Sequence, residues 1–242
     1  MKIYGLTFLF SFIGVFVHAQ YTDSTQHYLM FSANGVLNKT NESRSYVLNN
    51  NLRFGIRKRT VSLNTAAGWI YGATNKNLTN NDFTGALDFN IFTRNKHFYY
   101  WGLATYDKSV SLKINDRVQV GAGAAYSIIE SPTLYLNLSD GIIFENNDLI
   151  MPDGKPDLYS TFRNSFRLRY RFSHKIFVLD GTHFLQNSVT DISDYVVKSI
   201  SSFSLKLNRF ISINSTLTYN KLNRTKRENL LLTFGFTLEK YF

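Results

Sequence analysis

Residues 228–242, at the carboxyl end of the chain, alternate between apolar and more polar side chains. Side chains point to opposite faces of a β-strand with a period of two, so this stretch predicts a strand with one apolar and one mostly polar face. The stretch ends on the aromatic residue Phe242. Such a stretch is typical of the closing strand of an outer-membrane β-barrel. Its apolar face would carry Leu230, Leu232, Phe234, Phe236 and Leu238.

The same alternation recurs along the chain and predicts twelve strands. Five short turns alternate with six longer polar loops, of which the longest is expected at residues 145–159 and another at 73–80. An even number of strands places both chain ends on the side of the short turns, as in single-chain bacterial barrels. The predicted fold class is therefore all-β: a transmembrane, antiparallel up-and-down β-barrel. The predicted strands are residues 27–37, 45–56, 61–71, 82–92, 97–106, 116–128, 134–144, 162–172, 175–186, 196–207, 210–219 and 228–242.

The start of the chain has the organisation of a secretory signal peptide. Lys2 precedes an apolar run from Ile3 to Val17, and a small-residue exit follows at Ala19. The run is shorter than the roughly 20 apolar residues of a membrane-spanning helix. We therefore expect residues 1–19 to be removed as a signal peptide and residues 20–242 to form one barrel domain. A closed barrel is favoured because it bonds every backbone polar group internally, as lipid requires.

The composition supports a surface that faces lipid over a broad band. Charged residues make up 18% of the sequence, against about 25% in soluble domains, and aromatic residues make up 16%. The sequence has no cysteine, which excludes disulfides, thiolate metal sites and a lipoprotein anchor. The net charge of +10 would suit anionic lipid, an anionic solute or nucleic acid. Because no lysine-rich helix or arm is present, nucleic acid is not expected as a partner.

The predicted strand at residues 162–172 carries the most distinctive candidate site. One face of this strand is aromatic and leucine-rich, and the other face is rich in arginine. Arginines that line a barrel would form a positive constriction that favours anions. The candidate basic ladder of the lumen consists of Arg163, Arg167, Arg169 and Arg171, with Arg53 from another strand.

A structural role for these arginines is an open alternative. Their guanidinium groups would then pair with inward acids such as Asp88, Asp180 and Glu239, and the interior would be filled. A barrel of twelve strands lies between the filled small barrels and the open porins, so its size does not decide the matter.

Three further stretches resemble a known family. They are an Asn- and Thr-rich segment at residues 35–45, a strand of small residues at 118–127, and the barrel-type ending at 232–242. Together they resemble the YdiY-like, salt-induced outer-membrane proteins, a barrel family of unknown function. The resemblance implies a protein of the Gram-negative outer membrane that is folded by the barrel-assembly machinery. The residues expected to form the assembly signal are Phe234, Phe236, Leu238 and Phe242.

The sequence indicates no catalytic centre, metal site or cofactor. His183 and Ser188 are on one predicted strand at positions of opposite parity, so they would lie on opposite faces. The acids of residues 145–157, expected in a hydrated loop, lack the spacing of a calcium loop. We predict that the protein is not an enzyme, with an outer-membrane lipid-modifying enzyme as the alternative.

Two functions fit a barrel of this kind. One is a narrow, porin-like pore for small, preferentially anionic solutes, and the other is a structural, stress-related envelope role without transport. Outer-membrane lipid is an expected partner; the basic segment 221–227 is expected to be a solvated loop, with lipopolysaccharide phosphates as an alternative ligand. A soluble secreted β-sandwich is a third class. The sequence leaves the cargo, the opening of the lumen and the oligomeric state undetermined.

Overall fold

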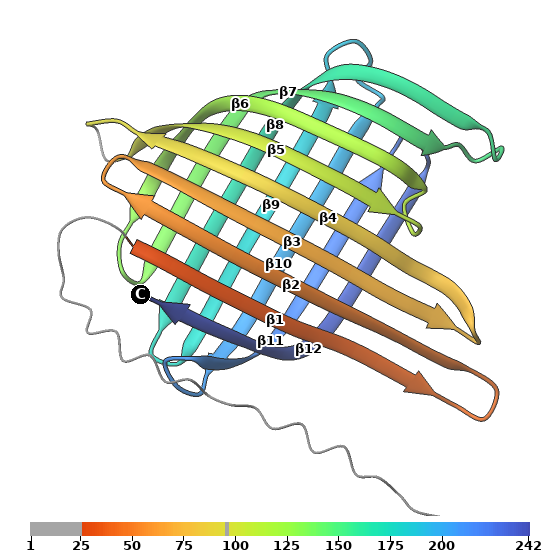
Figure 1. The fold of residues 1–242 in the computed structure, drawn as a ribbon, viewed down its shortest axis with the longest axis horizontal. Helices are drawn as coiled ribbons and strands as arrows, with labels where there is room; N and C mark the ends of the chain where they lie inside the picture. Colours follow the sequence, from red (N-terminus) through yellow and green to blue (C-terminus); the bar gives the residue numbers. More distant parts are fainter. Residues whose placement is uncertain (1–25, 95–96) are drawn as a thin grey trace, which may run out of the picture.

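The chain forms one sheet of twelve strands that closes into a barrel (Figure 1). The computed structural model describes residues 26–94 and 97–242, so the expected signal peptide at residues 1–19 lies outside the described residues. In these two ranges no helix is long and apolar enough to cross a membrane. The strands are β1 (Gln26–Lys39), β2 (Arg44–Lys58), β3 (Val61–Thr74), β4 (Asn77–Phe92), β5 (Phe98–Ser109), β6 (Ile114–Glu130), β7 (Leu134–Ile150), β8 (Pro156–His174), β9 (Phe177–Ser188), β10 (Tyr195–Lys206), β11 (Ile211–Leu222) and β12 (Arg227–Tyr241).

Each strand pairs antiparallel with its neighbours in sequence, and β1 pairs with β12 to close the sheet. The closing register runs from Tyr28 opposite Tyr241 to Gly35 opposite Phe234. A closed sheet has no free edge, so the strands bond their backbone groups within the barrel, as lipid requires. The predicted antiparallel up-and-down barrel of twelve strands, closed by the last predicted strand, is confirmed.

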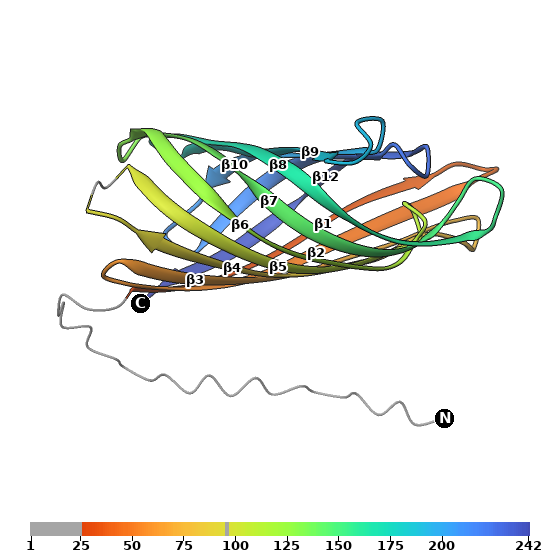
Figure 2. The ribbon, with the colours of Figure 1, turned by 90° about the horizontal axis from the view of Figure 1, so that it is seen from above.

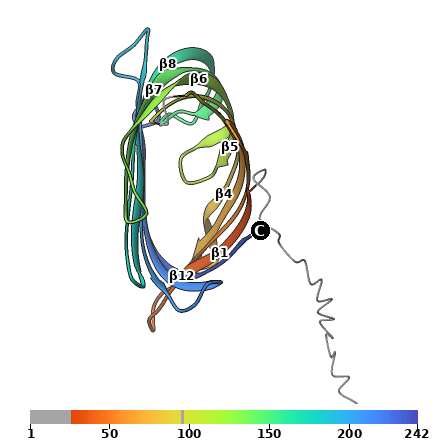
Figure 3. The ribbon, with the colours of Figure 1, turned by 90° about the vertical axis from the view of Figure 1, so that its left-hand side faces the viewer.

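The barrel has two ends with different contents. The start of β1 and the C-terminus lie at one end, which we call the terminal end; it also carries the β2–β3, β4–β5, β6–β7, β8–β9 and β10–β11 connections (Figure 2). The remaining connections form the opposite end, which we call the loop end. Seen along its axis, the barrel is a flattened oval, and the β5–β6 connection bends into its interior (Figure 3).

The alternation along β12 separates an apolar outer wall from a polar inner wall. The outward side chains of Leu230, Phe234 and Phe236 are 67%, 56% and 46% exposed, whereas the inward Thr233 and Thr237 are 0% and 8% exposed. Exposed leucines and phenylalanines continue around the other strands. An apolar outer wall of this extent suits lipid and would be unfavourable in water.

The predicted alternation of short turns and long loops is wrong. β3 and β4 are joined by two residues, Asn75 and Lys76, with φ of 49° and 70°, where a loop was predicted at 73–80. β7 and β8 likewise continue through most of the predicted loop 145–159, and residues 151–155 connect them. These strands rise beyond the apolar band, where polar residues occupy both faces. The polarity of both segments was therefore mistaken for the polarity of a loop.

Candidate functional site

Arg163 on β8 is the centre of a buried network at the loop end of the lumen. Its side chain is 0% exposed, and its Nε donates a hydrogen bond to Glu145 Oε1 on β7 at 2.7 Å. Its terminal nitrogens donate to the backbone carbonyl and the carboxylate of Asp194 at 2.8 and 2.9 Å, and to the hydroxyl of Tyr159 at 2.9 Å. Two carboxylates therefore compensate one enclosed guanidinium group. The prediction that Glu145 lies in a hydrated loop is wrong, because its side chain is also 0% exposed.

Gln119 extends this network across the interior. Its Nε2 donates to Glu145 Oε2 at 2.6 Å and lies 3.4 Å from the amide oxygen of Gln186. Gln119 belongs to β6 and Gln186 to β9; these strands are not neighbours in the sheet, so the contact spans the lumen. Arg117 and Asp107 form an ion pair of 2.9 Å at the same end, with side chains that are 7% and 8% exposed. Side chains therefore fill this part of the barrel.

The inward β5–β6 connection adds a cover to the loop end. Asp82 on β4 accepts hydrogen bonds from the Ser109 hydroxyl at 2.9 Å and from the amide and hydroxyl of Ser111 at 3.1 and 2.6 Å. From the other side, Asn229 on β12 donates to Ser111 Oγ at 3.3 Å. The connection is thus held from two walls of the barrel. An apolar cluster at this end consists of Ile114, Leu149, Val196 and Leu222, with Leu112 of the connection packed against it.

Arg224 joins the β11–β12 connection to the same network. Its Nε donates to Asp157 Oδ2 at 2.6 Å, and its guanidinium carbon lies 3.7 Å from the centre of the Tyr159 ring. The prediction of a solvated loop at 221–227 is wrong for Arg224. The segment 221–227 consists of the end of β11, the connection at residues 223–226 and the first residue of β12.

In the β9–β10 connection, hydrogen bonds from the Ser193 hydroxyl and amide lower the pKa of Asp191.

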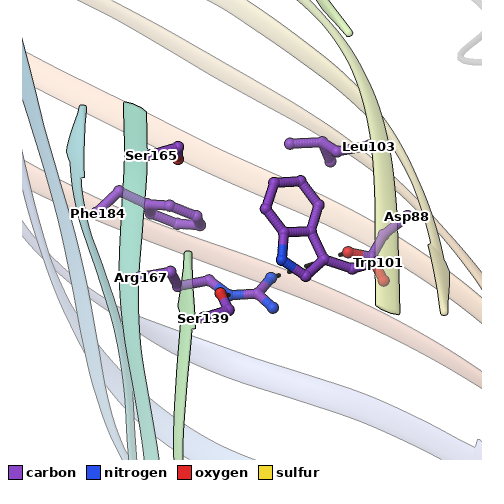
Figure 4. Close-up of a pocket in the computed structure, with 7 residues that line it drawn as sticks. All are labelled: Asp88, Trp101, Leu103, Ser139, Ser165, Arg167 and Phe184. Carbon is purple, nitrogen blue, oxygen red and sulfur yellow. Dashed lines mark hydrogen bonds and ion pairs between the residues drawn. The ribbon is translucent and has the colours of Figure 1, made fainter. Parts of the chain in front are cut away.

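Trp101 and Arg167 narrow the middle of the lumen (Figure 4). The Trp101 side chain lies against the Gly123–Gly141 pair, where a Cβ on either glycine would come within 2.5 Å of its Cζ2 atom. Arg167 on β8 donates from Nε to Ser139 Oγ at 3.0 Å, and its Nη1 lies 3.9 Å from Asp88 Oδ2 on β4. The free space among these side chains is about 10 Å³. That is room for about one water molecule.

A larger cavity opens at the terminal end of the lumen. Its volume is about 280 Å³. Arg169 faces this cavity, with its guanidinium carbon 5.8 Å from the centre of the Tyr135 ring. Arg57 also lines it and lies over the Phe92 ring at 4.4 Å. The cavity is therefore walled by basic, aromatic and neutral polar side chains together with the acid Glu130, and Arg169 is exposed within it.

Basic charge is incompletely compensated in this half of the lumen. Asp180 on β9 is the acid that lies close to Arg53 of β2 and to Arg169 and Arg171 of β8. Arg167 uses Asp88. Four guanidinium groups therefore share two carboxylates, whereas Glu239 is already paired with Lys206 at 3.6 Å. The five residues of the predicted basic ladder thus fall into two groups, with Arg163 in the loop-end network and the others in this cluster.

The residues of the predicted assembly signal lie on the outer wall of β12 and just beyond its end. The side chains of Phe234, Phe236, Leu238 and Phe242 are 56%, 46%, 43% and 56% exposed. The Phe242 ring stacks on His27 with a centroid distance of 5.6 Å, and their backbones exchange hydrogen bonds of 2.8 and 3.0 Å.

His183 lies on the outer wall, where it meets a serine of another strand. Ser188 faces inward and bonds to Thr161 at 2.8 Å, so His183 and Ser188 are on opposite faces, as predicted. However, His183 Nδ1 lies 2.7 Å from Ser199 Oγ on β10. Reasoning within one strand missed this pair, because it depends on the register between β9 and β10.

The fold and its polar lumen define an outer-membrane type of β-barrel. The chain belongs to the family of proteins of unknown function DUF481, whose model matches residues 32–239. The predicted membership of the YdiY-like barrel family is thereby confirmed. No curated protein sequence matches the chain.

Solved outer-membrane barrels are similar to the chain in structure, and the NanC porin shares its fold. The NanC porin is 10% identical with a TM-score of 0.51, and the match covers 87% of this chain and 97% of that chain. The translocator domain of autotransporter NalP from Neisseria meningitidis is 10% identical with a TM-score of 0.48, covering 91% and 89% of the two chains. The KdgM porin is 7% identical with a TM-score of 0.47, covering 87% and 98%. At these identities the likeness concerns the fold alone.

Proposed function

We propose that the protein is a channel of the bacterial outer membrane that passes small, preferentially anionic solutes through a narrow, gated lumen. The observation that carries this proposal is the arginine cluster between the constriction and the terminal end, where four guanidinium groups share two carboxylates and Arg169 faces a cavity of about 280 Å³. Uncompensated positive charge on the wall of a narrow lumen attracts anions and repels cations. As in single-chain bacterial barrels with an even number of strands, the end that carries both chain ends would face the periplasm.

Passage through the proposed channel requires movement at two levels. The Trp101–Arg167 constriction would have to widen, and the β5–β6 connection would have to leave its hydrogen bonds to Asp82. Both obstacles are side chains or a short connection attached to an intact wall. Gating can therefore occur without any change in the strand pairing of the barrel.

A structural envelope role without transport is the second candidate function. The filled loop end favours it, because the Arg163 network leaves no solvent-exposed surface on either Arg163 or Glu145. The lipid-modifying enzyme remains the weakest candidate: His183 and Ser199 supply a base beside a hydroxyl, but this pair is on the outer wall within the apolar band. In each case we propose outer-membrane lipid and the assembly machinery as partners, with Phe242 and the outward residues of β12 as the signal.

Conductance in planar lipid bilayers tests the channel. The purified protein should give single-channel events, and its reversal potential in a KCl gradient should indicate anion preference. Arg169→Glu should reduce or invert that preference, because this side chain is exposed in the terminal cavity. Arg209→Glu is the matched control, since the same charge change then falls on the exposed β10–β11 connection. Absence of single-channel events at every salt concentration would contradict the channel and favour the structural role.

A further inference from the structure

The outer wall of β7–β10 carries polar side chains within the otherwise apolar band. Asn164 on β8 donates from Nδ2 to both carboxylate oxygens of Asp140 on β7, at 2.9 and 3.2 Å, and both residues are exposed. On β9, His183 bonds to Ser199 at 2.7 Å and stacks on Tyr170 with a centroid distance of 5.5 Å. We call these five residues the outer polar patch.

The patch lies at the level of the hydrocarbon. Asp140 alternates with Leu138 and Ile142 on the outer face of β7, near the middle of the outward apolar run from Leu134 to Phe144. Ionisable side chains within a membrane are costly and usually pair with one another. The internal bonds satisfy the patch incompletely, because a carboxylate accepts about four hydrogen bonds and an imidazole has two nitrogens. Among the residues that the structure describes, His183 uses Nδ1 alone.

Acid and base occupy opposite sides of the patch at one depth. Asp140 is on β7 and His183 on β9, which places them about 10 Å apart around the wall. From β7 to β11, residues that oppose one another on successive strands lie progressively nearer to the loop end. Leu185 of β9 opposes Val197 of β10, and Val197 opposes Lys221 at the loop end of β11. His183 lies two positions back toward the terminal end from Leu185, which offsets this displacement. The two ionisable side chains therefore share a level in the membrane.

This arrangement is complementary to itself. A two-fold axis parallel to the membrane normal preserves depth and exchanges the two sides of the patch, so Asp140 of one copy would face His183 of a second copy, and the reverse. The wall that runs from β8 toward β12 is one of the long sides of the flattened barrel, and β7 and β8 lie where this side curves into the narrow end (Figure 3). We propose that the outer polar patch is the interface of a homodimer in the membrane, in which Asp140 and His183 pair between copies.

The absence of cysteine from the sequence allows a direct test by disulfide formation. Leu168 lies on the outer wall of β8, opposite His183 and close to the expected axis. Leu168→Cys should therefore form a disulfide-linked dimer in native membranes under a mild oxidant. Leu52→Cys is the matched control, because Leu52 is an outward leucine of β2, 48% exposed and outside the patch. It should remain monomeric under the same conditions.

A mass measurement in detergent supplies an independent test that needs no cysteine. The wild-type protein should have the mass of two chains, and Asp140→Leu should have the mass of one while keeping the heat-modifiable gel mobility of a folded barrel. A wild-type monomer, or equal disulfide formation at both cysteine positions, would overturn the interface. Loss of a lipid-hydrolysing activity in His183→Ala, with the wild-type copies separate, would overturn it too and assign the patch to catalysis.

Discussion

Arg163 and Arg169 lie on the same face of β8, but their surroundings differ at the two ends of the lumen. Arg163 is 0% exposed and donates hydrogen bonds to Glu145, Asp194 and Tyr159. Arg169 is exposed beside a cavity and shares Asp180 with two other arginines. An arginine at the loop end, Arg163, therefore holds the walls together, whereas an arginine at the terminal end, Arg169, presents its positive charge to the cavity.

This difference suggests a division of work along the axis. The loop-end network binds β6, β7, β8 and the β9–β10 connection to one another, so it fixes the shape of the barrel. The terminal cluster has fewer carboxylates than arginines, and its Arg169 faces open space, so it can act on solutes. Substitutions at the two ends should accordingly change different properties, with the largest effect on stability at Arg163 and the smallest at Asp82.

Loss of Arg163 should have the largest effect on stability. Arg163→Leu leaves Glu145 buried without its ion-pair partner and Asp194 with Arg224 alone, which we expect to cost about 3–5 kcal/mol of unfolding free energy. Arg169→Leu, on the same strand face, should cost less than about 1 kcal/mol because that side chain is exposed to solvent. Denaturant unfolding of the folded barrel in detergent measures both. Equal losses for the two variants would remove the distinction between the ends.

The double variant Arg163→Leu with Glu145→Leu sharpens the same comparison. Removing both charges should recover part of the stability that Arg163→Leu loses, because the unpaired carboxylate of Glu145 is then absent. No recovery would indicate that packing, rather than charge compensation, dominates at this end.

A side chain added beside Trp101, at the constriction between the two ends of the lumen, should have an intermediate effect on stability. Gly123→Ala places a Cβ 2.5 Å from Trp101 Cζ2 and also against the backbone of β7, which we expect to cost about 1–3 kcal/mol. Gly102→Ala is the control on the neighbouring strand, since its nearest atom would be the Gly121 carbonyl oxygen at 3.9 Å. Denaturant unfolding again reports the difference. A neutral Gly123→Ala would show that both the Trp101 side chain and the backbone of β7 give way without cost.

Release of the β5–β6 connection should have the smallest effect on the barrel as a whole. Asp82→Ala removes the hydrogen bonds to Ser109 and Ser111, which we expect to cost about 1 kcal/mol, mostly by local opening. Amide hydrogen exchange at residues 109–113 should become faster, and the proposed channel should open more often. Asp153→Ala, in an exposed ion pair with Lys155, should change neither property. Unchanged exchange at 109–113 would exclude Asp82 as the latch of this connection.

The wall of the barrel was predictable from the sequence because its cause is local. Alternation along each stretch assigns the inner and outer faces, and it placed Asp88 and the β8 arginines on the inner side. The predicted loops failed because polar composition was given more weight than alternation. In β7, Glu145 keeps the inward parity of Ser139 and Ile143, and this parity was the signal that could have located it in the lumen.

The loop-end network could not be derived in the same way. Arg163 bonds to Asp194 of the β9–β10 connection, and Gln119 contacts Gln186 across the interior. Each contact therefore depends on the relative heights of several strands. The His183–Ser199 pair has the same origin. A shift of one residue in register would turn these side chains to the other face. Sequence alternation determines the face of a residue, whereas the register determines its partners.

The pairing of His27 with Phe242 has a consequence for the order in which the barrel forms. The β1–β12 register, from Tyr28 to Gly35, is the shortest of the twelve, and it joins the two ends of the folded chain. Ends so distant in sequence lose the most chain entropy when they meet, which favours late closure. Since the backbone of Phe242 bonds to His27, the seam is complete only when residue 242 has joined the sheet. The same seam is where the finished cylinder would first come apart.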